Sequence, residues 1–179
     1  IYMSFRNYDI DNPVSNQYKL MRRCQTMEYA KRMKETNLDR LKNNGQKMNI
    51  MTCIDKMDDI TDLSDPDLSL SNINHLYQTA ESIRKNGESE WLQVVGLIHD
   101  LGKVMLLDEF GKLPQWSVVG DNFPTGCEFN DKIVFSEFFK DNPDTTNPKF
   151  NTKYGIYKPN CGFDNVTMSW SHDEYLFNV

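Results

Sequence analysis

What this 179-residue sequence lacks narrows its class before any motif is considered. It holds only four cysteines, at positions 24, 53, 127 and 161, and no two of them form a C-x-x-C pair. Cysteines scattered in this way are typical of free thiols in a reducing compartment, so we expect a cytoplasmic protein without disulfide bonds. The chain also has only three histidines, so any imidazole that it supplies to a site must come from these three.

Long hydrophobic runs and an excess of positive charge are also missing. No apolar run approaches the roughly 18 residues that a membrane-spanning helix needs, and residues 1–10 lack the basic start and apolar stretch of a signal peptide. The net charge of −6 argues against a nucleic-acid-binding protein, which would present a basic face. We therefore expect neither a membrane nor a nucleic acid among the partners.

Hydrophobic residues are nonetheless frequent enough, at 39%, for one domain with its own core. We expect residues 1–179 to be that single domain. The chain begins with Ile1 rather than Met, and Val179 falls inside an apolar helical pattern. We therefore expect a fragment that is truncated at the C-terminus and also at the N-terminus.

The spacing of apolar residues indicates an all-α fold. Steps of three and four residues predict helices over 14–38, 47–59, 73–85, 88–101 and 165–179. Five of the seven prolines lie in residues 106–165, which we expect to form a long ordered loop region. Two short apolar runs in this region, 116–119 and 133–135, are interpreted as brief strands of a small β-hairpin.

The stretch 91–105, WLQVVGLIHDLGKVM, combines an apolar helical run with charged residues. Its apolar side chains recur at steps of three and four residues: Trp91, Val94, Val95 and Ile98. His99 and Asp100 follow directly. Gly102 is interpreted as a helix stop, with Lys103 just beyond it. A carboxylate beside an imidazole among buried apolar residues is costly unless a positive group satisfies it, and a metal ion is one candidate. The alternative is a helix end with an exposed aspartate and a partly buried histidine.

All three histidines fall on, or beside, predicted helices. His75 and His172 lie on two helices other than the one that leads to His99, and helical bundles build metal sites from side chains on facing helices. Asp100 carries two oxygens and can bridge two ions. Nitrogen and carboxylate ligands without thiolate suit iron, zinc or manganese, and they would also fit a mononuclear site with two histidines and one carboxylate. A single histidine on a helix is more often structural, so only the combination favours a metal.

Two polar stretches have both a structural and a functional interpretation. Residues 58–67 hold five aspartates and a proline, so they form neither a strand nor a helix interior. The plainer interpretation is a solvated loop that caps a helix, and the functional one is a loop that offers oxygens to a polyol or a cation. Arg6, between Phe5 and Tyr8, fits a surface arm when these residues are considered alone.

The sequence HDLGK at 99–103 resembles the HD-domain superfamily. The motif of this metal-dependent, all-helical family is a histidine, a later His-Asp pair and a further aspartate. The resemblance implies an HD-domain-like helical bundle. Most members are phosphohydrolases, so this motif alone implies hydrolysis of phosphate esters.

Six separated stretches resemble the myo-inositol oxygenase family across nearly the whole chain. They are FRNY at 5–8, SDPD at 64–67, QTAESIRK at 78–85, VGLIHDLGK at 95–103, PQWSVVGDNFPTGC at 114–127 and MSWSHDEYL at 168–176. The resemblance implies an oxidoreductase with two mixed-valent, non-haem iron ions (Fe). It further implies that the enzyme cleaves the ring of myo-inositol with one O2, yields D-glucuronate and is a monomer.

The same resemblance assigns roles to individual residues. His75, His99 and Asp100 match ligands of one iron. Asp100, as a bridging carboxylate, and His172 match ligands of the second. The residues that match substrate contacts are Arg6, Asp62, Leu63, Ser64, Lys103, Gly120 and Asp121. This set offers a polyol both hydrogen-bond donors and acceptors, and Lys103 beside a metal-bound hydroxyl would favour the alkoxide. Lys103 and Asp100 are therefore the predicted catalytic residues.

Members of this family continue beyond the position of Val179. That part supplies one further histidine and one further aspartate to the irons, with a serine and a lysine for the substrate. Because metal affinity falls steeply when ligands are missing, we expect this chain by itself to bind iron poorly and not to turn over, whereas the full-length protein is active. The alternatives are an HD-family metal-dependent phosphohydrolase, and a degenerate product that binds a polyol or a partner without redox chemistry.

Overall fold

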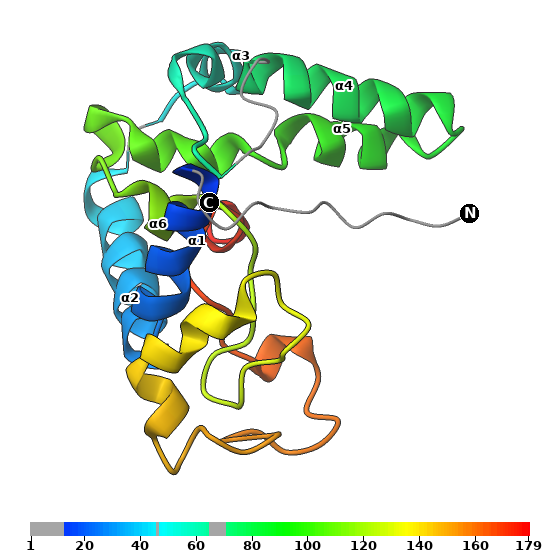
Figure 1. Ribbon diagram of the computed structural model, residues 1–179. Coiled ribbons are helices and arrows are strands. Elements are labelled where there is room, and N and C mark those ends of the chain that lie inside the picture. Colours follow the sequence, from blue (N-terminus) through cyan, green and yellow to red (C-terminus); the bar gives the residue numbers. More distant parts are fainter. Residues whose placement is uncertain (1–12, 46, 65–70) are drawn as a thin grey trace.

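A computed structural model describes residues 13–45, 47–64 and 71–179. These ranges are mainly helical, which confirms the all-α prediction. The α-helices are α1 (Pro13–Cys24), α2 (Met27–Asn44), α3 (Ile50–Lys56), α4 (Asn72–Lys85), α5 (Glu90–Ile98), α6 (Gln115–Val118) and α7 (His172–Phe177). Short 3-10 helices connect them: η1 (Met57–Asp59), η2 (Leu101–Leu106), η3 (Asp108–Phe110), η4 (Ser136–Asp141), η5 (Pro143–Thr146) and η6 (Phe163–Asn165). Figure 1 shows α3, α4 and α5 together at one end of the molecule and the turn-rich segment between α6 and α7 at the other.

The small β-hairpin expected in the loop region is wrong for the described residues. The first of the two apolar runs forms α6, and the second lies in turns. Pro124 and Met168 make an isolated antiparallel bridge, and no strand occurs in the ranges that the structure describes. The runs are apolar because they bury side chains in two separate cores, Val118 and Val119 in one and Phe135 in the other.

The first predicted helix, 14–38, is interrupted between α1 and α2 by Gln25 and Thr26. The Thr26 hydroxyl oxygen accepts a hydrogen bond from the Tyr29 amide at 3.0 Å and so begins α2 as an N-cap. The buried Gln25 side chain donates to the Trp170 carbonyl at 2.6 Å and accepts from the Trp170 amide at 3.0 Å. The apolar spacing continues across the break, so periodicity alone did not reveal it.

Asn142 is a buried residue that holds this break in place. Its side-chain nitrogen donates to the carbonyl oxygens of Arg22 at 2.6 Å and Gln25 at 3.1 Å, and its side-chain oxygen accepts from the Asp144 amide at 2.9 Å. We expect Asn142→Ala to lower the free energy of unfolding by about 2–3 kcal/mol, because two buried carbonyl groups lose a donor. Urea denaturation measures the loss, with exposed Asn151→Ala as the matched control. Equal stability of the two variants would contradict this role.

α4 and α5 pack against each other, and α5 leads into the His-Asp pair. They approach closely at Gly96, where a Cβ atom would lie 3.5 Å from the Ala80 backbone. Most of the apolar stripe of α5, expected among buried residues, is instead exposed: Trp91 is 68% exposed, Val94 52% and Val95 41%. Its last member, Ile98, is half-buried and packs on the core around η2. α5 contacts α4 through the face that carries Gly96, and not through its three exposed apolar residues.

The residues after Asp100 continue directly as η2, so the interpretation of Gly102 as a helix stop is wrong. η2 is buried between two core clusters. Leu101 and Val104 pack in the first with Ile54, Met57, Ile60 and Leu76, and Met105 packs in the second with Val118, Val119 and Trp170. η2 also contacts α7. The His-Asp pair is therefore held where α5 meets a segment whose first five residues are buried.

The last predicted helix, 165–179, is shorter than expected and begins at His172. The Ser171 hydroxyl oxygen accepts from the Asp173 amide at 3.0 Å, which makes Ser171 the N-cap of α7. His172 is thus the first residue of its helix.

The helices of the described ranges are each too short or too polar to cross a bilayer. All four cysteines have free thiols. The cytoplasmic location inferred from these thiols stays a prediction.

Candidate metal centre

Asp100 lies at the centre of a cluster that contains all three histidines. Its Oδ2 atom is 3.6 Å from His75 Nε2 and 3.5 Å from His99 Nε2. Its Oδ1 atom is 3.2 Å from His172 Nε2. Asp100 and His172 are buried, whereas the side chains of His75 and His99 are 45% and 32% exposed. One carboxylate oxygen thus faces the imidazoles of His75 and His99, and the other faces that of His172.

Backbone carbonyl groups orient two of these imidazoles. His99 Nδ1 lies 2.8 Å from the Gly96 carbonyl oxygen, and His172 Nδ1 lies 2.7 Å from the Val118 carbonyl oxygen. Because a carbonyl oxygen only accepts, each Nδ1 must carry the proton of the hydrogen bond. In a neutral ring this leaves the Nε2 lone pair free, as in histidines that bind metals.

Lys103 brings positive charge to the cluster. Its Nζ atom lies 2.8 Å from Asp100 Oδ2 and 2.8 Å from Asp62 Oδ2. Burial works against the charge of Lys103, but the two carboxylates outweigh it and raise the pKa of the amine. Burial likewise opposes ionisation of Asp100, but its hydrogen bond to His172 and the charge of Lys103 hold the pKa of this carboxyl well below its usual range. At neutral pH the cluster therefore contains an anionic Asp100.

The donor set fits a transition-metal ion. His75, His99 and Asp100 each offer one ligand atom, and these atoms lie within 4.8 Å of one another. Imidazole nitrogen with carboxylate oxygen suits iron, zinc or manganese. A neutral imidazole with a free Nε2 has no proton to donate to Asp100, so a cation between them satisfies both groups. A proton is the alternative cation at His172: burial opposes protonation there, but hydrogen bonding to Asp100 raises the pKa of the imidazole.

Gly102 allows η2 to lie directly against His172. A Cβ atom at Gly102 would lie 2.1 Å from the His172 carbonyl oxygen and 2.9 Å from its Cα atom. The position therefore requires glycine for close approach of two backbones rather than for a turn. This contact ties the His99-Asp100 pair to the third histidine.

The segment Asp62–Ser64 belongs to the same network. The Ser64 amide and hydroxyl both donate to Asp62 Oδ1, at 2.8 and 2.6 Å, while Asp62 Oδ2 faces the buried amine described above. The Gln115 side chain fixes the segment by donating to the Thr61 carbonyl at 2.7 Å and accepting from the Leu63 amide at 3.2 Å. Within the part of the acidic loop that the structure describes, Asp62 and Ser64 are thus buried beside the cluster, whereas Asp58, Asp59 and Thr61 are exposed.

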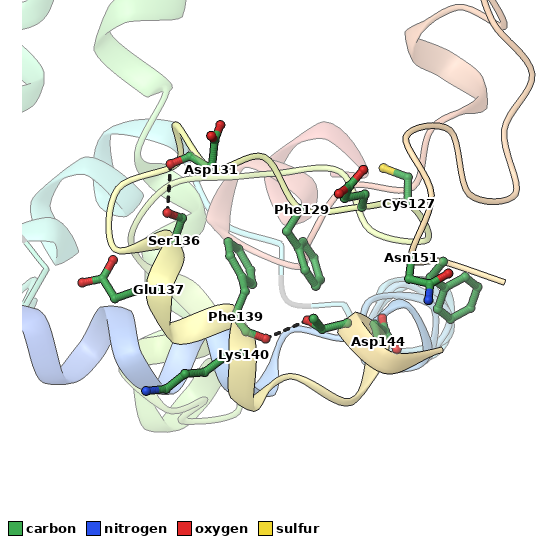
Figure 2. Close-up of a pocket in the computed structure, with 12 residues that line it drawn as sticks. Cys127, Phe129, Asp131, Ser136, Glu137, Phe139, Lys140, Asp144 and Asn151 are labelled. Carbon is green, nitrogen blue, oxygen red and sulfur yellow. Dashed lines mark hydrogen bonds between the residues drawn. The ribbon is translucent and has the colours of Figure 1, made fainter. Parts of the chain in front are cut away.

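The pocket drawn in Figure 2 lies elsewhere in the molecule. It is a cavity of about 460 Å³ beside η4, and Phe129 and Phe139 stack in it with ring centroids 4.0 Å apart. Among the described residues, none of the predicted metal ligands or substrate contacts lines this cavity. The histidine cluster and the pocket are therefore separate features.

Known proteins are similar to this sequence over almost its whole length. A profile of the family described as myo-inositol oxygenase matches residues 11–179. The chain belongs to the myo-inositol oxygenase family. It is 47% identical over 181 residues to inositol oxygenase 1 of Arabidopsis thaliana, an alignment that covers 98% of this chain and 57% of that protein.

Animal members of the myo-inositol oxygenase family are similar to the same extent. The chain is 45% identical over 182 residues to the inositol oxygenase of Danio rerio, covering 99% of this chain and 63% of that protein. It is 44% identical over 181 residues to that of Rattus norvegicus, covering 98% and 61%. The chain thus spans about three-fifths of the length of the curated relatives it matches.

The structure brings most of the site residues predicted from the family resemblance into one network. The four predicted metal ligands meet at Asp100, and Asp62, Leu63, Ser64 and Lys103 adjoin them. Gly120 and Asp121 are not in direct contact with this network among the described residues, and Asp121 pairs with Arg22 instead. Arg6 lies outside the described residues. The roles of all these residues stay predictions.

Two residues of the network were missed by the sequence interpretation. Asn72 accepts from Lys103 Nζ at 3.3 Å and donates to the Ile60 carbonyl at 2.5 Å. Its place three residues before His75, on the same helix face, is a signal that points to it. Gln115 offers no such signal, because its partners are more than 50 residues away in the sequence.

Proposed function

We propose that the full-length protein is an inositol oxygenase that converts myo-inositol and O2 into D-glucuronate and water. The ring C1–C6 bond breaks and four electrons pass from the substrate to O2. One oxygen atom enters the product and the other leaves as water. The observation that carries the proposal is the convergence of His75, His99 and His172 on Asp100 in a chain of this family.

We propose two iron ions as the cofactor, with Asp100 as the shared ligand. The support is geometric: one carboxylate oxygen faces His75 and His99, and the other faces His172. Histidine and carboxylate are ligands that non-haem iron accepts. A bound iron pair would supply the redox chemistry for O2 and polarise the substrate oxygen.

The residues of the chain itself would bind and orient the polyol. Lys103 and Asp62 form a buried pair of donor and acceptor beside Asp100, and a polyol hydroxyl needs both kinds of partner. Next to a substrate hydroxyl, the Lys103 ammonium would favour the alkoxide through its charge. The substrate would enter from the side of His75 and His99, because their side chains are the exposed part of the centre.

Turnover by the full-length gene product tests this proposal. We expect O2 uptake that depends on both myo-inositol and Fe(II), with one glucuronate formed for each O2 consumed. Release of phosphate from nucleotides with Mn(II), without inositol-dependent O2 uptake, would replace the proposal with an HD phosphohydrolase. Binding of inositol with neither reaction would identify a protein that has lost catalysis.

A further inference from the structure

Arg22 of α1 is a fully buried cation that the proposed chemistry does not use. Its side chain is 0% exposed. The guanidinium carbon lies between 5.0 and 5.3 Å from the ring centroids of Tyr18, Phe123 and Phe139. Nε and Nη2 both donate to the Val134 carbonyl, at 3.1 and 2.9 Å. A buried guanidinium is costly unless its partners are well placed, so its position inside an aromatic core requires an explanation.

The same guanidinium holds Asp121, which the family resemblance matches to a substrate contact. Arg22 Nη2 donates to Asp121 Oδ1 at 2.6 Å. The Asp121 side chain is 41% exposed, and its Oδ2 atom has no polar partner among the described residues. One carboxylate oxygen is therefore fixed from the protein interior, and the other is available to an external donor.

The segment that carries Asp121 is docked on α1 and linked to the metal centre. Gly120 has a φ of 92°, and a Cβ atom there would lie 2.0 Å from Met21 Cε, so the segment packs directly on that side chain. The carbonyl of Val118 accepts the hydrogen bond from His172 Nδ1. Three residues of chain span at most about 11 Å, which limits the distance between the Cα atoms of Val118 and Asp121.

We propose that Arg22 is a positioning residue for the polyol site and acts through Asp121. It fixes one oxygen of the carboxylate and so directs the other toward a hydroxyl of the substrate. The inference rests on the proposed function and adds to it a residue that makes no substrate contact of its own. The aromatic rings restrict the guanidinium: Phe139, which lies against Phe129 in Figure 2, packs on it directly.

The kinetic test compares Arg22→Met, Arg22→Lys and Asp121→Asn in the full-length gene product. We expect Arg22→Met to raise KM for myo-inositol about tenfold, with kcat changed less than about twofold and iron content unchanged. Arg22→Lys keeps the charge but loses the planar contact with two partners, so its KM should rise about threefold. The double variant Arg22→Met/Asp121→Asn should match Asp121→Asn alone, because Arg22 acts only through that carboxylate.

Hydrogen exchange of residues 118–123 adds a measurement that does not depend on turnover. Exchange should be faster in Arg22→Met and unchanged in Arg23→Met, which alters an exposed arginine of the same helix. If Arg22→Met fails to fold, Arg22→Lys provides the same comparison.

Two results would overturn the inference while the proposed function stands. One is that the wild-type protein oxidises inositol, while KM for inositol and hydrogen exchange in the Arg22 variants stay at the wild-type values. The other is that the double variant Arg22→Met/Asp121→Asn raises KM by the product of the two single effects, as independent residues do. Failure of the wild-type protein to oxidise inositol would instead overturn the proposed function, and with it the substrate role of Arg22.

Discussion

Replacement of Asp100 by asparagine is expected to abolish metal binding and turnover in the full-length protein while the chain still folds. Asparagine has the shape of aspartate but no charge, so the cluster loses the anionic carboxylate on which the three imidazoles converge. We expect the affinity for Fe(II) to fall at least about 1,000-fold and inositol-dependent O2 uptake to disappear. Iron content after anaerobic gel filtration and titration with Co(II) measure the loss.

The fold should survive this change because Lys103 keeps Asp62 as its partner at 2.8 Å, and no buried amine is left unpaired. The matched control is Asp108→Asn, which removes an exposed carboxylate paired with Lys112 at the surface. This control should bind iron as the wild type does. If the Asp100 variant holds iron as tightly as the control, the histidine cluster is not the metal centre.

Gly102→Ala is expected to force η2 away from α7 and to weaken both the fold and the metal centre. The added methyl group would meet three backbone atoms of His172 at 2.1–2.9 Å. Backbone atoms cannot relieve such a clash by a change of rotamer, as a side chain can. We expect the free energy of unfolding to fall by about 3 kcal/mol in urea denaturation. Displacement of His172 should also lower the affinity for iron at least about tenfold in the same titration.

Gly96→Ala is the matched control, because it adds the same methyl group in the neighbouring helix α5. There the methyl would meet the end of the Ile83 side chain, at 2.4 Å, which is able to rotate. Alanine also gains up to about 1 kcal/mol over glycine in a helix interior. We expect the stability of this variant to stay within about 1 kcal/mol of the wild type. Equal losses in the Gly96 and Gly102 variants would mean that the contact with His172 places no special constraint on the protein.

Helix positions followed from the sequence more reliably than helix ends did. α4 was predicted within one residue because its signals are local: it is preceded by Ser71 and followed by Asn86 and Gly87. The break after α1 was missed because Gln25 bonds Trp170 and Asn142, which lie more than 100 residues away in the sequence. Periodicity also did not show which side of α5 meets its neighbour, so the exposure of Trp91 was unexpected.

The sequence by itself determined the all-α class, the family, and the three histidines and one aspartate of the candidate metal centre. These depend on local spacing and on residue types within short motifs. Only the tertiary structure decided which oxygen of Asp100 faces which imidazole, that Gly102 serves a backbone contact with His172, and that Arg22 holds Asp121. The physical reason is that these contacts join atoms from segments far apart along the chain, whereas apolar periodicity reports only the environment of each segment.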